Sequence, residues 1–424
     1  MRKFIKLAAL GHLLVSSACL ASSEPKALDN KPAPAAPSPF VLAPLSPSIG
    51  TDGSVTFRFS AAQATSVEVK GSFPNPYQPE TVKLARNSEG EWVGTSSPLM
   101  PDMYSYNIYV DGISAMDPGN AHFRRDAGRL SNTFTVSGTL ADLYTVKPVP
   151  HGTVSGIWYL SAKFARQRRA MVYTPPGYEG GSEHYPVLFL LHGGMGDEDS
   201  WSGNGRVPQI LDNLIASKAI VPMIVVMPNV NASQTASSDY IENFEPQGSF
   251  FDMDFPDSLV SELVPFIDRT YRTRPDSLNR AVAGLSMGGA HALWAAFKHP
   301  GTFSWVESMS GGYMIIPGLG LESSRPTNTQ IPDLYRFPTA IDPDKVFAVL
   351  PGLGSPAMTK MRMFTLTVGA KDMLLGQQRT LAEALQKRHV RATVSEVPGY
   401  SHEWGFWRKE LVNMLPRLFR TVNH

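Results

Sequence analysis

Apolar and polar residues follow two different patterns along the chain. In its first part, Ser54–Ser60, Ser66–Lys70 and Met103–Val110 alternate apolar and polar positions, as half-buried strands do. Asp-Gly and Asn-Pro turn signals separate these segments. Several short strands at this spacing predict a small all-β region over residues 41–138, arranged as an immunoglobulin-like sandwich.

From residue 148 to residue 424, buried apolar runs alternate with amphipathic segments. A hairpin is expected over Val154–Val172. The expected strands after it are Val187–Leu191, Met223–Met227, Ala281–Ala283, Ser304–Met309, Phe364–Val368 and Ala392–Val397. The expected helices are Gln209–Ser217, Phe255–Tyr271, Gly289–Phe297, Arg379–Arg388 and Phe406–Phe419. This alternation predicts an α/β fold with a mostly parallel sheet that is covered on both faces. The Pro- and Gly-rich segment Gly311–Met358 is interpreted as an insertion near the site and a candidate lid.

The first residues indicate export. Met1–Lys6 is basic, and the apolar stretch Leu7–Leu20 that follows is too short to span a bilayer. We therefore expect a signal peptide over residues 1–21. Residues 22–40 are rich in Pro, Ala and Ser and have too little apolar surface to fold, which predicts a linker.

The single cysteine of the chain, Cys19, lies within this signal. It follows Val15-Ser16-Ser17-Ala18, which resembles a relaxed bacterial lipobox, so Cys19 is a candidate lipidation site and membrane tether. Ordinary cleavage after Ala21 is the alternative. Both routes predict an exported protein, which is periplasmic, attached to the cell surface or secreted.

Composition excludes several classes of partner and site. One cysteine in 424 residues cannot form an intramolecular disulfide or a cysteine-cluster metal site. The formal net charge of +1 argues against a nucleic acid held by bulk electrostatics. We expect no metal and no cofactor.

The candidate chemistry centres on Gly284-Leu285-Ser286-Met287-Gly288, a G-x-S-x-G motif between an apolar run and an Ala-rich helix. This context is typical of a nucleophile elbow, where a sharp turn exposes the serine hydroxyl at the edge of the sheet. Small glycines leave space between strand and helix, and the helix N-terminus favours developing negative charge. The alternative is a glycine-rich turn that contains a serine by chance.

In α/β-hydrolases the acid and the histidine follow the serine along the chain. Asp372 comes directly after the strand Phe364–Val368, and His402 comes between the last strand and the last helix. His402 would accept the proton of Ser286, and Asp372 would orient the imidazole. Glu396 and Asp333 are the alternative acids.

Two backbone N–H groups are needed to bind the oxyanion that forms during acyl transfer. One is expected from Met287, the residue after the serine. The second is expected from the loop His192-Gly193-Gly194 after an earlier strand, with Gly194 as first choice and Met195 as the alternative.

Taken together, these motifs resemble the esterase D-like family of α/β-hydrolases, which includes feruloyl esterases, S-formylglutathione hydrolases, enterochelin esterases and mycolyltransferases. The matching motifs are Leu191-His192-Gly193-Gly194, Val226-Met227-Pro228-Asn229, Gly284–Gly289, Gly369–Asp372 and Gly399–His402. The first region resembles the early-set sandwich domains that precede some esterases. The matching residues there are Gly71-Ser72-Phe73, Gly90-Glu91-Trp92, Tyr104-Ser105-Tyr106 and Val110-Asp111-Gly112.

The resemblance implies a serine carboxylesterase that acts through an acyl-enzyme. Together with export, it favours a feruloyl esterase whose substrate is esterified hemicellulose or oligosaccharide. An acetyl xylan esterase and an enterochelin-esterase-like hydrolase are alternatives, and a non-catalytic glycan-binding lipoprotein is a fourth. Trp201, Tyr313 and Trp404 are candidate substrate contacts because these aromatic residues lie near the motif loops.

Overall fold

The computed structural model describes residues 45–74, 79–126, 129–194, 196–232, 253–320 and 340–420. The predicted signal peptide, the predicted linker and Cys19 lie outside these residues, as does Met195. From Ala43 onward the chain belongs to one compact unit. Within the described ranges, none of the helices combines the length and the apolar character that a bilayer crossing requires.

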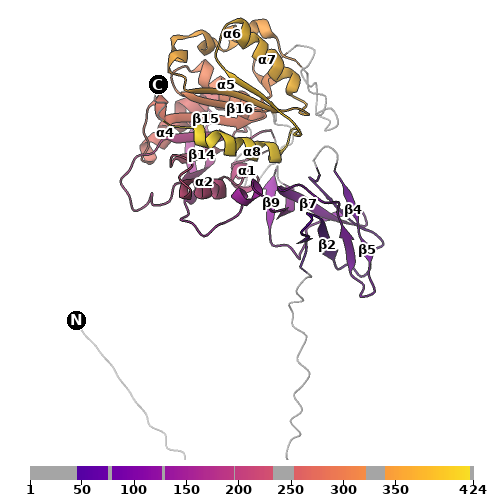
Figure 1. Cartoon of the computed structure of the whole chain (residues 1–424). Coiled ribbons are helices and arrows are strands. Elements are labelled where there is room, and N and C mark those ends of the chain that lie inside the picture. Colours follow the sequence, from indigo (N-terminus) through magenta and orange to yellow (C-terminus); the bar gives the residue numbers. More distant parts are fainter. Residues whose placement is uncertain are drawn as a thin grey trace, which may run out of the picture. The chain divides into compact units, whose positions relative to one another are not determined.

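Two antiparallel sheets form the first region (Figure 1). The first has the order β1 (Ser48–Ile49), β2 (Val55–Phe59), β6 (Trp92–Thr95) and β5 (Ala85–Arg86). The second has the order β4 (Thr81–Lys83), β3 (Val67–Gly71), β7 (Met103–Val110), β10 (Arg129–Thr135) and β9 (Phe123–Asp126), with β8 (Ile113–Ala115) paired to β7. The predicted all-β region is thus confirmed, while the immunoglobulin-like arrangement stays a prediction.

Alternation along β7 explains how these sheets bury one face. Tyr104, Tyr106 and Ile108 point into a core that both sheets share, whereas Ser105 and Asn107 lie on the opposite face. The shared core is rich in aromatic side chains, with Phe57, Phe73, Tyr104, Tyr106 and Phe134 in mutual ring contact. Such contacts stabilise a small core beyond the area that they bury.

The second region is built on an eight-stranded sheet. Its order is β11 (Thr153–Ser161), β12 (Arg166–Thr174), β14 (Ile224–Pro228), β13 (Val187–Leu191), β15 (Arg280–Leu285), β16 (Trp305–Met309), β17 (Met363–Gly369) and β18 (Thr393–Val397). The β11–β12 and β12–β14 pairs are antiparallel and all the others are parallel. The predicted α/β fold with a mostly parallel sheet is therefore confirmed.

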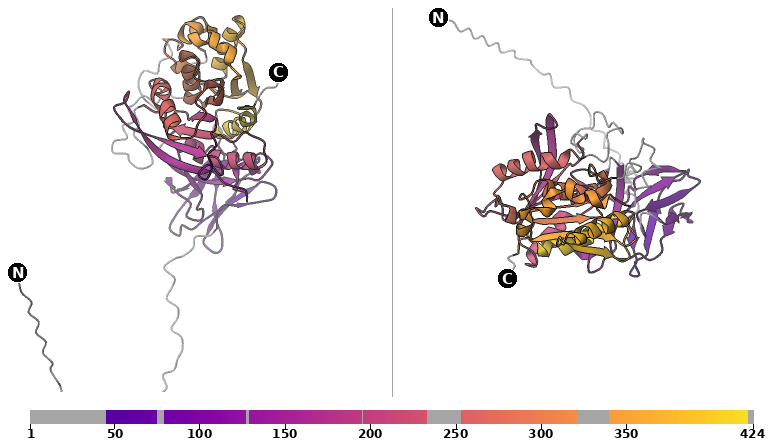
Figure 2. Two further views of the ribbon diagram at one scale, coloured as in Figure 1. Left: turned by 90° about the vertical axis from the view of Figure 1, so that its left-hand side faces the viewer. Right: turned by 90° about the horizontal axis from the view of Figure 1, so that it is seen from above.

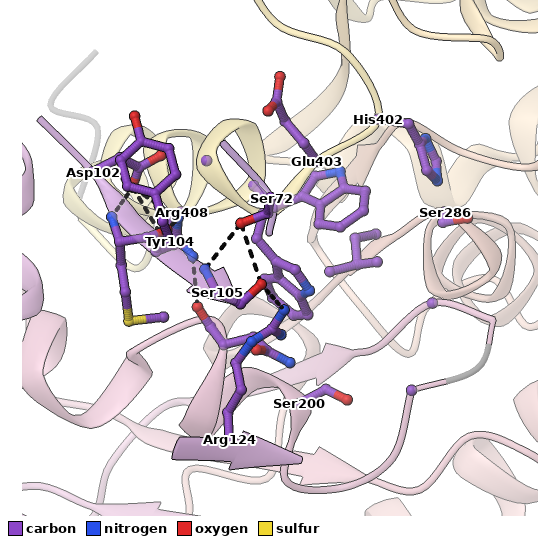
Figure 3. A pocket seen from close by; sticks show the side chains of 18 of the residues that line it. Ser72, Asp102, Tyr104, Ser105, Arg124, Ser200, Ser286, His402, Glu403 and Arg408 are labelled. Carbon is purple, nitrogen blue, oxygen red and sulfur yellow. Dashed lines mark hydrogen bonds and ion pairs between the residues drawn. The ribbon is translucent and has the colours of Figure 1, made fainter. Parts of the chain in front are cut away.

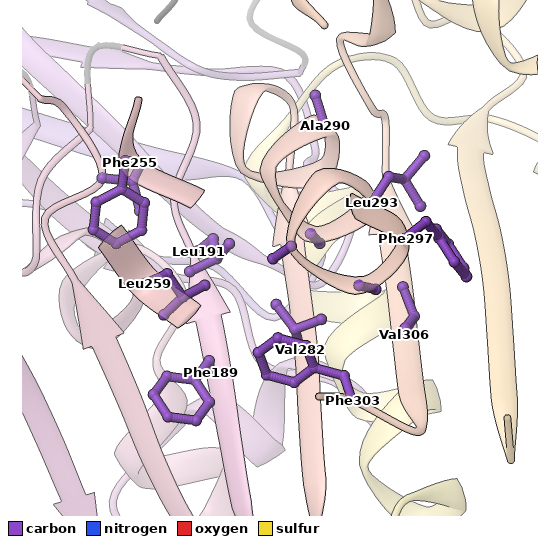
Figure 4. Close-up of a cluster of buried hydrophobic side chains, with 14 of the residues drawn as sticks. Phe189, Leu191, Phe255, Leu259, Val282, Ala290, Leu293, Phe297, Phe303 and Val306 are labelled. Carbon is purple, nitrogen blue, oxygen red and sulfur yellow. The ribbon is translucent and has the colours of Figure 1, made fainter. Parts of the chain in front are cut away.

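Helices cover both faces of this sheet (Figures 1 and 2). They are α1 (Ser200–Gly203), α2 (Val207–Ala216), α3 (Phe255–Ser258), α4 (Val264–Thr270), α5 (Met287–Lys298), α6 (Val346–Val349), α7 (Leu375–Lys387) and α8 (Trp404–Met414). One core lies between the sheet and α5 and includes Phe189, Val282 and Phe297 (Figure 4). A second core, on the other face, receives α2 and α8. The inner strands are apolar at successive positions because both of their faces are buried.

The structure corrects one expectation. The helix predicted over Phe255–Tyr271 contains a wide π turn at Leu259–Leu263 between α3 and α4. Pro265 explains it, because proline has no N–H to donate and its ring crowds the preceding turn. The described flanks of the predicted insertion bury apolar residues in the main core, and the lid stays a prediction. Residues 321–339 lie outside the described residues.

Candidate active site

Ser286 occupies the turn between β15 and α5 with φ 53° and ψ −118°. A positive φ is costly for a residue with a side chain, so this conformation must be held by its surroundings. The Ser286 N–H donates to Met309 O at 2.9 Å, and the Gly312 N–H donates to Ser286 O at 3.0 Å. These bonds tie the elbow to the end of β16.

Glycines around the serine allow three chain segments to approach one another. A Cβ on Gly284 would lie 2.3 Å from Gly288 O. A Cβ on Gly288 would lie 2.4 Å from His192 O and 2.5 Å from Leu191 O. No side chain fits at either position, so the G-x-S-x-G spacing here reflects close packing of strand, helix and the neighbouring loop.

Asp372 and His402 meet across two neighbouring strand ends. Asp372 follows β17 and His402 follows β18, and His402 Nδ1 lies 3.0 Å from Oδ2 and 3.2 Å from Oδ1 of Asp372. The Leu374 N–H also donates to Asp372 Oδ1, at 2.8 Å. A proton on Nδ1 that faces the carboxylate leaves Nε2 as the acceptor.

The surroundings of Asp372 keep it ionised although its side chain is fully buried. Burial alone would raise the pKa of Asp372, but the charge and hydrogen bond of His402, the Leu374 N–H and the Ser310 hydroxyl together lower that pKa. The indole of Trp407 packs edge-on against the His402 ring at 5.0 Å and donates to Ser310 Oγ at 3.2 Å. Ser310 and Trp407 thus help to position Asp372 and His402, a role that no sequence motif indicated.

The described residues favour Asp372 over the alternative acids. Glu396 accepts two hydrogen bonds of 2.7 Å from Arg379, and both bonds are exposed to solvent. Asp333 lies outside the described residues.

Ser286 and His402 line the same cavity, which has a volume of about 410 Å³. Figure 3 shows the imidazole lying next to the serine at one end of this space. The volume falls within the range of pockets that hold small ligands. Trp404 and Gly194 also line the cavity. The two residues thus share a space that a substrate could enter.

The glycine loop after β13 packs directly against the elbow. A Cβ on Gly193 would lie 2.6 Å from Leu285 Cδ1 and 3.1 Å from Ser286 Cβ. This approach places the Gly194 backbone at the cavity. Met287 is the first residue of α5, so its N–H belongs to the helix N-terminus beside Ser286. The use of both N–H groups as oxyanion donors stays a prediction.

His192 fixes this loop, a role that the sequence motif did not indicate. The Val230 N–H donates to His192 Nε2 at 2.9 Å, so Nδ1 carries the proton and donates to Gly193 O at 2.7 Å. Burial lowers the pKa of His192 to about 4, so the ring is neutral at physiological pH. A buried strand end followed by His-Gly-Gly was the available signal.

Two of the three aromatic candidates are wrong as substrate contacts. Trp201 is only 1% exposed and packs edge-on under Trp404 in the second core. Tyr313 is fully buried, and its hydroxyl lies 3.1 Å from Ser308 Oγ. Large aromatic side chains near a loop fill the core as readily as they line a pocket. Trp404 lines the cavity, and its contact with substrate remains a prediction.

The first region also contributes to the cavity, which the sequence could not indicate. Asp102, at the start of β7, binds the buried Arg408 of α8 at 2.7 Å. Ser72, Ser105 and Arg124 of the all-β region line the same cavity as Ser286. No group of three His, Cys, Asp or Glu side chains suited to a metal ion occurs among the described residues.

The sheet order, the strained serine at the strand-to-helix turn and the histidine after the last strand define the class of α/β-hydrolases. The model of the family described as "Esterase: Putative esterase" matches residues 161–418. The chain belongs to this esterase family. This match confirms the predicted resemblance to esterases, while the early-set resemblance of the first region stays a prediction. Membership of the family supports an activity as a carboxylic ester hydrolase.

The chain is similar to curated proteins and to solved structures. An endo-1,4-beta-xylanase/feruloyl esterase of Xylanibacter ruminicola is 30% identical over 88% of this chain, which spans only 46% of that relative's length. Among solved structures, the enterobactin esterase FES of Shigella flexneri matches 88% of this chain and 94% of its own, with a TM-score of 0.60 and 19% identity. The feruloyl esterase module from Clostridium thermocellum matches 66% of this chain and 93% of its own, with a TM-score of 0.50 and 17% identity. At these identities the two structures show the fold alone.

Proposed function

We propose that this protein is an exported serine carboxylesterase that hydrolyses acyl esters on plant cell-wall polysaccharide, with feruloyl esters as the first choice. The observation that carries the proposal is the Asp372–His402 contact of 3.0 Å beside the strained Ser286, at one cavity. Export and a lipid tether at Cys19 are part of the proposal and rest on the first residues of the sequence.

The proposed reaction has two steps. His402 Nε2 takes the proton of the Ser286 hydroxyl while Oγ attacks the ester carbonyl, and it then protonates the departing sugar oxygen. Water next attacks the acyl-enzyme with the same histidine as base. Asp372, ionised because its pKa is lowered, stabilises the imidazolium and keeps its orientation.

The N–H groups of Met287 and Gly194 would bind the oxyanion of each tetrahedral intermediate. Such donors act without reorganisation when the backbone already holds them in place. The neutral His192 supports this by fixing the loop through the Val230 N–H and Gly193 O. Losing one oxyanion donor typically lowers kcat by about 100- to 1,000-fold.

The substrate class is supported by sequence similarity over most of this chain to a relative whose name includes feruloyl esterase. Trp404 lines the cavity, and the buried Trp407 packs edge-on against it. Flat aromatic surfaces suit a cinnamoyl ring through stacking. Acetylated xylan and a catecholate ester are the alternative substrates.

The test is an ester panel that contains methyl ferulate, feruloylated and acetylated xylo-oligosaccharides, p-nitrophenyl acetate and a catecholate trilactone. We expect the feruloyl esters to give the highest kcat/KM, and Ser286→Ala to lower turnover by at least about 1,000-fold. Retained turnover in Ser286→Ala would exclude the serine mechanism. A preference for the acetyl or catecholate esters would replace the feruloyl assignment.

Covalent labelling separates an esterase from a glycan-binding protein without activity. A fluorophosphonate should modify Ser286, detected by mass spectrometry of the peptide that contains it. Heat-unfolded protein is the control, because the reagent needs the folded site. An unlabelled Ser286 in the folded protein would favour the binding protein.

A further inference from the structure

We propose that the all-β region forms the part of the active site that binds the carbohydrate, through a hydroxyl-rich wall made of Ser72, Ser105, Arg124 and Ser131. This inference rests on the proposed esterase function. All four residues line the cavity that also contains Ser286 and His402. The region would then act in substrate recognition, and the esterified sugar would contact both halves of the described chain.

The wall is the polar face of one sheet. Ser105 pairs with Thr133 across β7 and β10, and Ser131 pairs with Arg124 across β10 and β9, so their side chains share a face. The tyrosines beside Ser105 point the other way, into the aromatic core. A polar face of an antiparallel sheet is normally open to water. Here Ser105 is only 8% exposed, and Arg124 and Ser72 of the same region contact its hydroxyl.

Hydrogen bonds hold the wall in a defined arrangement. The Arg124 guanidinium donates to Ser105 Oγ at 2.9 Å, and Ser105 Oγ lies 3.2 Å from Ser72 Oγ. The Ser131 hydroxyl donates to Asn107 Oδ1 at 2.8 Å. Figure 3 shows Ser72, Ser105 and Arg124 grouped on one side, and Ser286 with His402 on the other. Each hydroxyl has one donor and two acceptor sites, so these side chains can bind a ligand in addition to one another.

The chemistry of the two walls assigns the two halves of the ester. Trp404, two residues after His402, lines the cavity and offers aromatic surface, which suits an acyl group with a ring. The facing wall offers hydroxyls and a guanidinium, which suit the many hydroxyls of a sugar. A site built from polar groups favours a substrate whose hydroxyls can pair with them. The methyl group of methyl ferulate has no such hydroxyls, so the wall should not favour that ester.

The experiment measures the ratio of kcat/KM for feruloylated arabinoxylo-oligosaccharide to kcat/KM for methyl ferulate. In Arg124→Ala and in Ser131→Ala we expect this ratio to fall by about five- to tenfold, the effect of losing one or two ligand hydrogen bonds. Ser114→Ala is the matched control, because Ser114 lies exposed on β8 of the same sheet and outside the cavity. Its ratio should equal that of the wild type.

Two results would overturn the inference. Equal losses on both substrates would mean that the wall only supports the fold, and unchanged ratios in both variants would mean that the sugar binds elsewhere. Calorimetry measures the binding of unesterified xylo-oligosaccharide and arabinoxylo-oligosaccharide. It separates failure of the inference about the wall from failure of the proposed esterase function. If no ester is hydrolysed, binding that Arg124→Ala abolishes still supports the wall, and the absence of binding overturns it.

Discussion

At the scale of single residues, the proposed function depends on a few side chains that the fold holds in energetically costly states. Ser286 has a positive φ, which costs about 1–3 kcal/mol for a residue of this type. Its hydrogen bonds to Met309 O and from the Gly312 N–H offset that cost. Asp372 is ionised although buried, which requires the hydrogen bonds around it. The site is therefore built from residues whose surroundings matter as much as their identity.

Replacing the acid should separate geometry from charge. We expect Asp372→Asn to fold and to lower kcat by about 10,000-fold, because an amide can no longer hold the productive tautomer of His402. Steady-state hydrolysis of methyl ferulate measures the loss. Glu396→Gln is the control, since this residue pairs with Arg379 at the surface. A large loss in Glu396→Gln with little change in Asp372→Asn would reverse the assignment of the acid.

At the scale of elements, the parallel strands place the candidate site residues at one edge of the sheet. The register aligns Leu191 with Gly284, Leu285 with Met309, and Gly369 with Val397. Residues that follow β13, β15, β17 and β18 therefore meet at the same end, as ligand sites do in sheets of this type. The strand β16, in the middle of this group, carries the buried Glu307.

Glu307 should make stability depend on pH. Burial raises the pKa of Glu307 to about 8, although Arg417 opposes the rise. The folded protein therefore keeps a proton that the unfolded chain releases, and this stabilising effect is lost as pH increases from about 4.5 to about 8. We expect Glu307 to make the free energy of unfolding in urea up to about 4 kcal/mol lower at pH 8 than at pH 5. Glu307→Gln should remove this contribution.

A matched surface change tests whether this dependence is specific. Glu183 is exposed, so Glu183→Gln should keep the wild-type difference in the free energy of unfolding between the two pH values. If Glu307→Gln also keeps that difference, Glu307 is ionised in the folded protein and its proposed buried neutral state is wrong.

At the scale of the whole described unit, ion pairs connect its two regions. Arg408 is 2% exposed and binds Asp102 Oδ1, Met103 O and Asn204 O. Arg125 of β9 binds Asp199 at 2.6 Å. Because Arg408 belongs to α8, which begins just after His402, the contact with the all-β region is close to the proposed active site.

Breaking the Arg408–Asp102 pair should destabilise the unit. We expect Asp102→Ala to lower the free energy of unfolding by about 3–5 kcal/mol, because it leaves the Arg408 charge buried without its partner. The double variant Asp102→Ala/Arg408→Met should recover part of that loss, which a double-mutant cycle in urea measures. Glu396→Ala, which breaks an exposed pair, should cost less than about 1 kcal/mol. A strictly additive cycle would show that the two charges do not stabilise each other.

The sequence by itself determined the elements and the location of the proposed chemistry. Strands such as Val187–Leu191 were found because burial on both faces leaves a continuous apolar run. Ser286, Asp372 and His402 were found because each follows a strand, and parallel strands end at one edge. The G-x-S-x-G spacing was visible because only glycine fits beside the elbow.

Only the tertiary structure decided what covers each face. Position in the sequence places Trp201 and Tyr313 near the motif loops. Whether they fill a core or line a pocket depends on distant segments that pack on them. The same holds for Arg408 and Asp102, which are 306 positions apart, and for the polar face that Ser105 presents to the cavity. These contacts join residues far apart in the sequence, so local sequence patterns do not predict them.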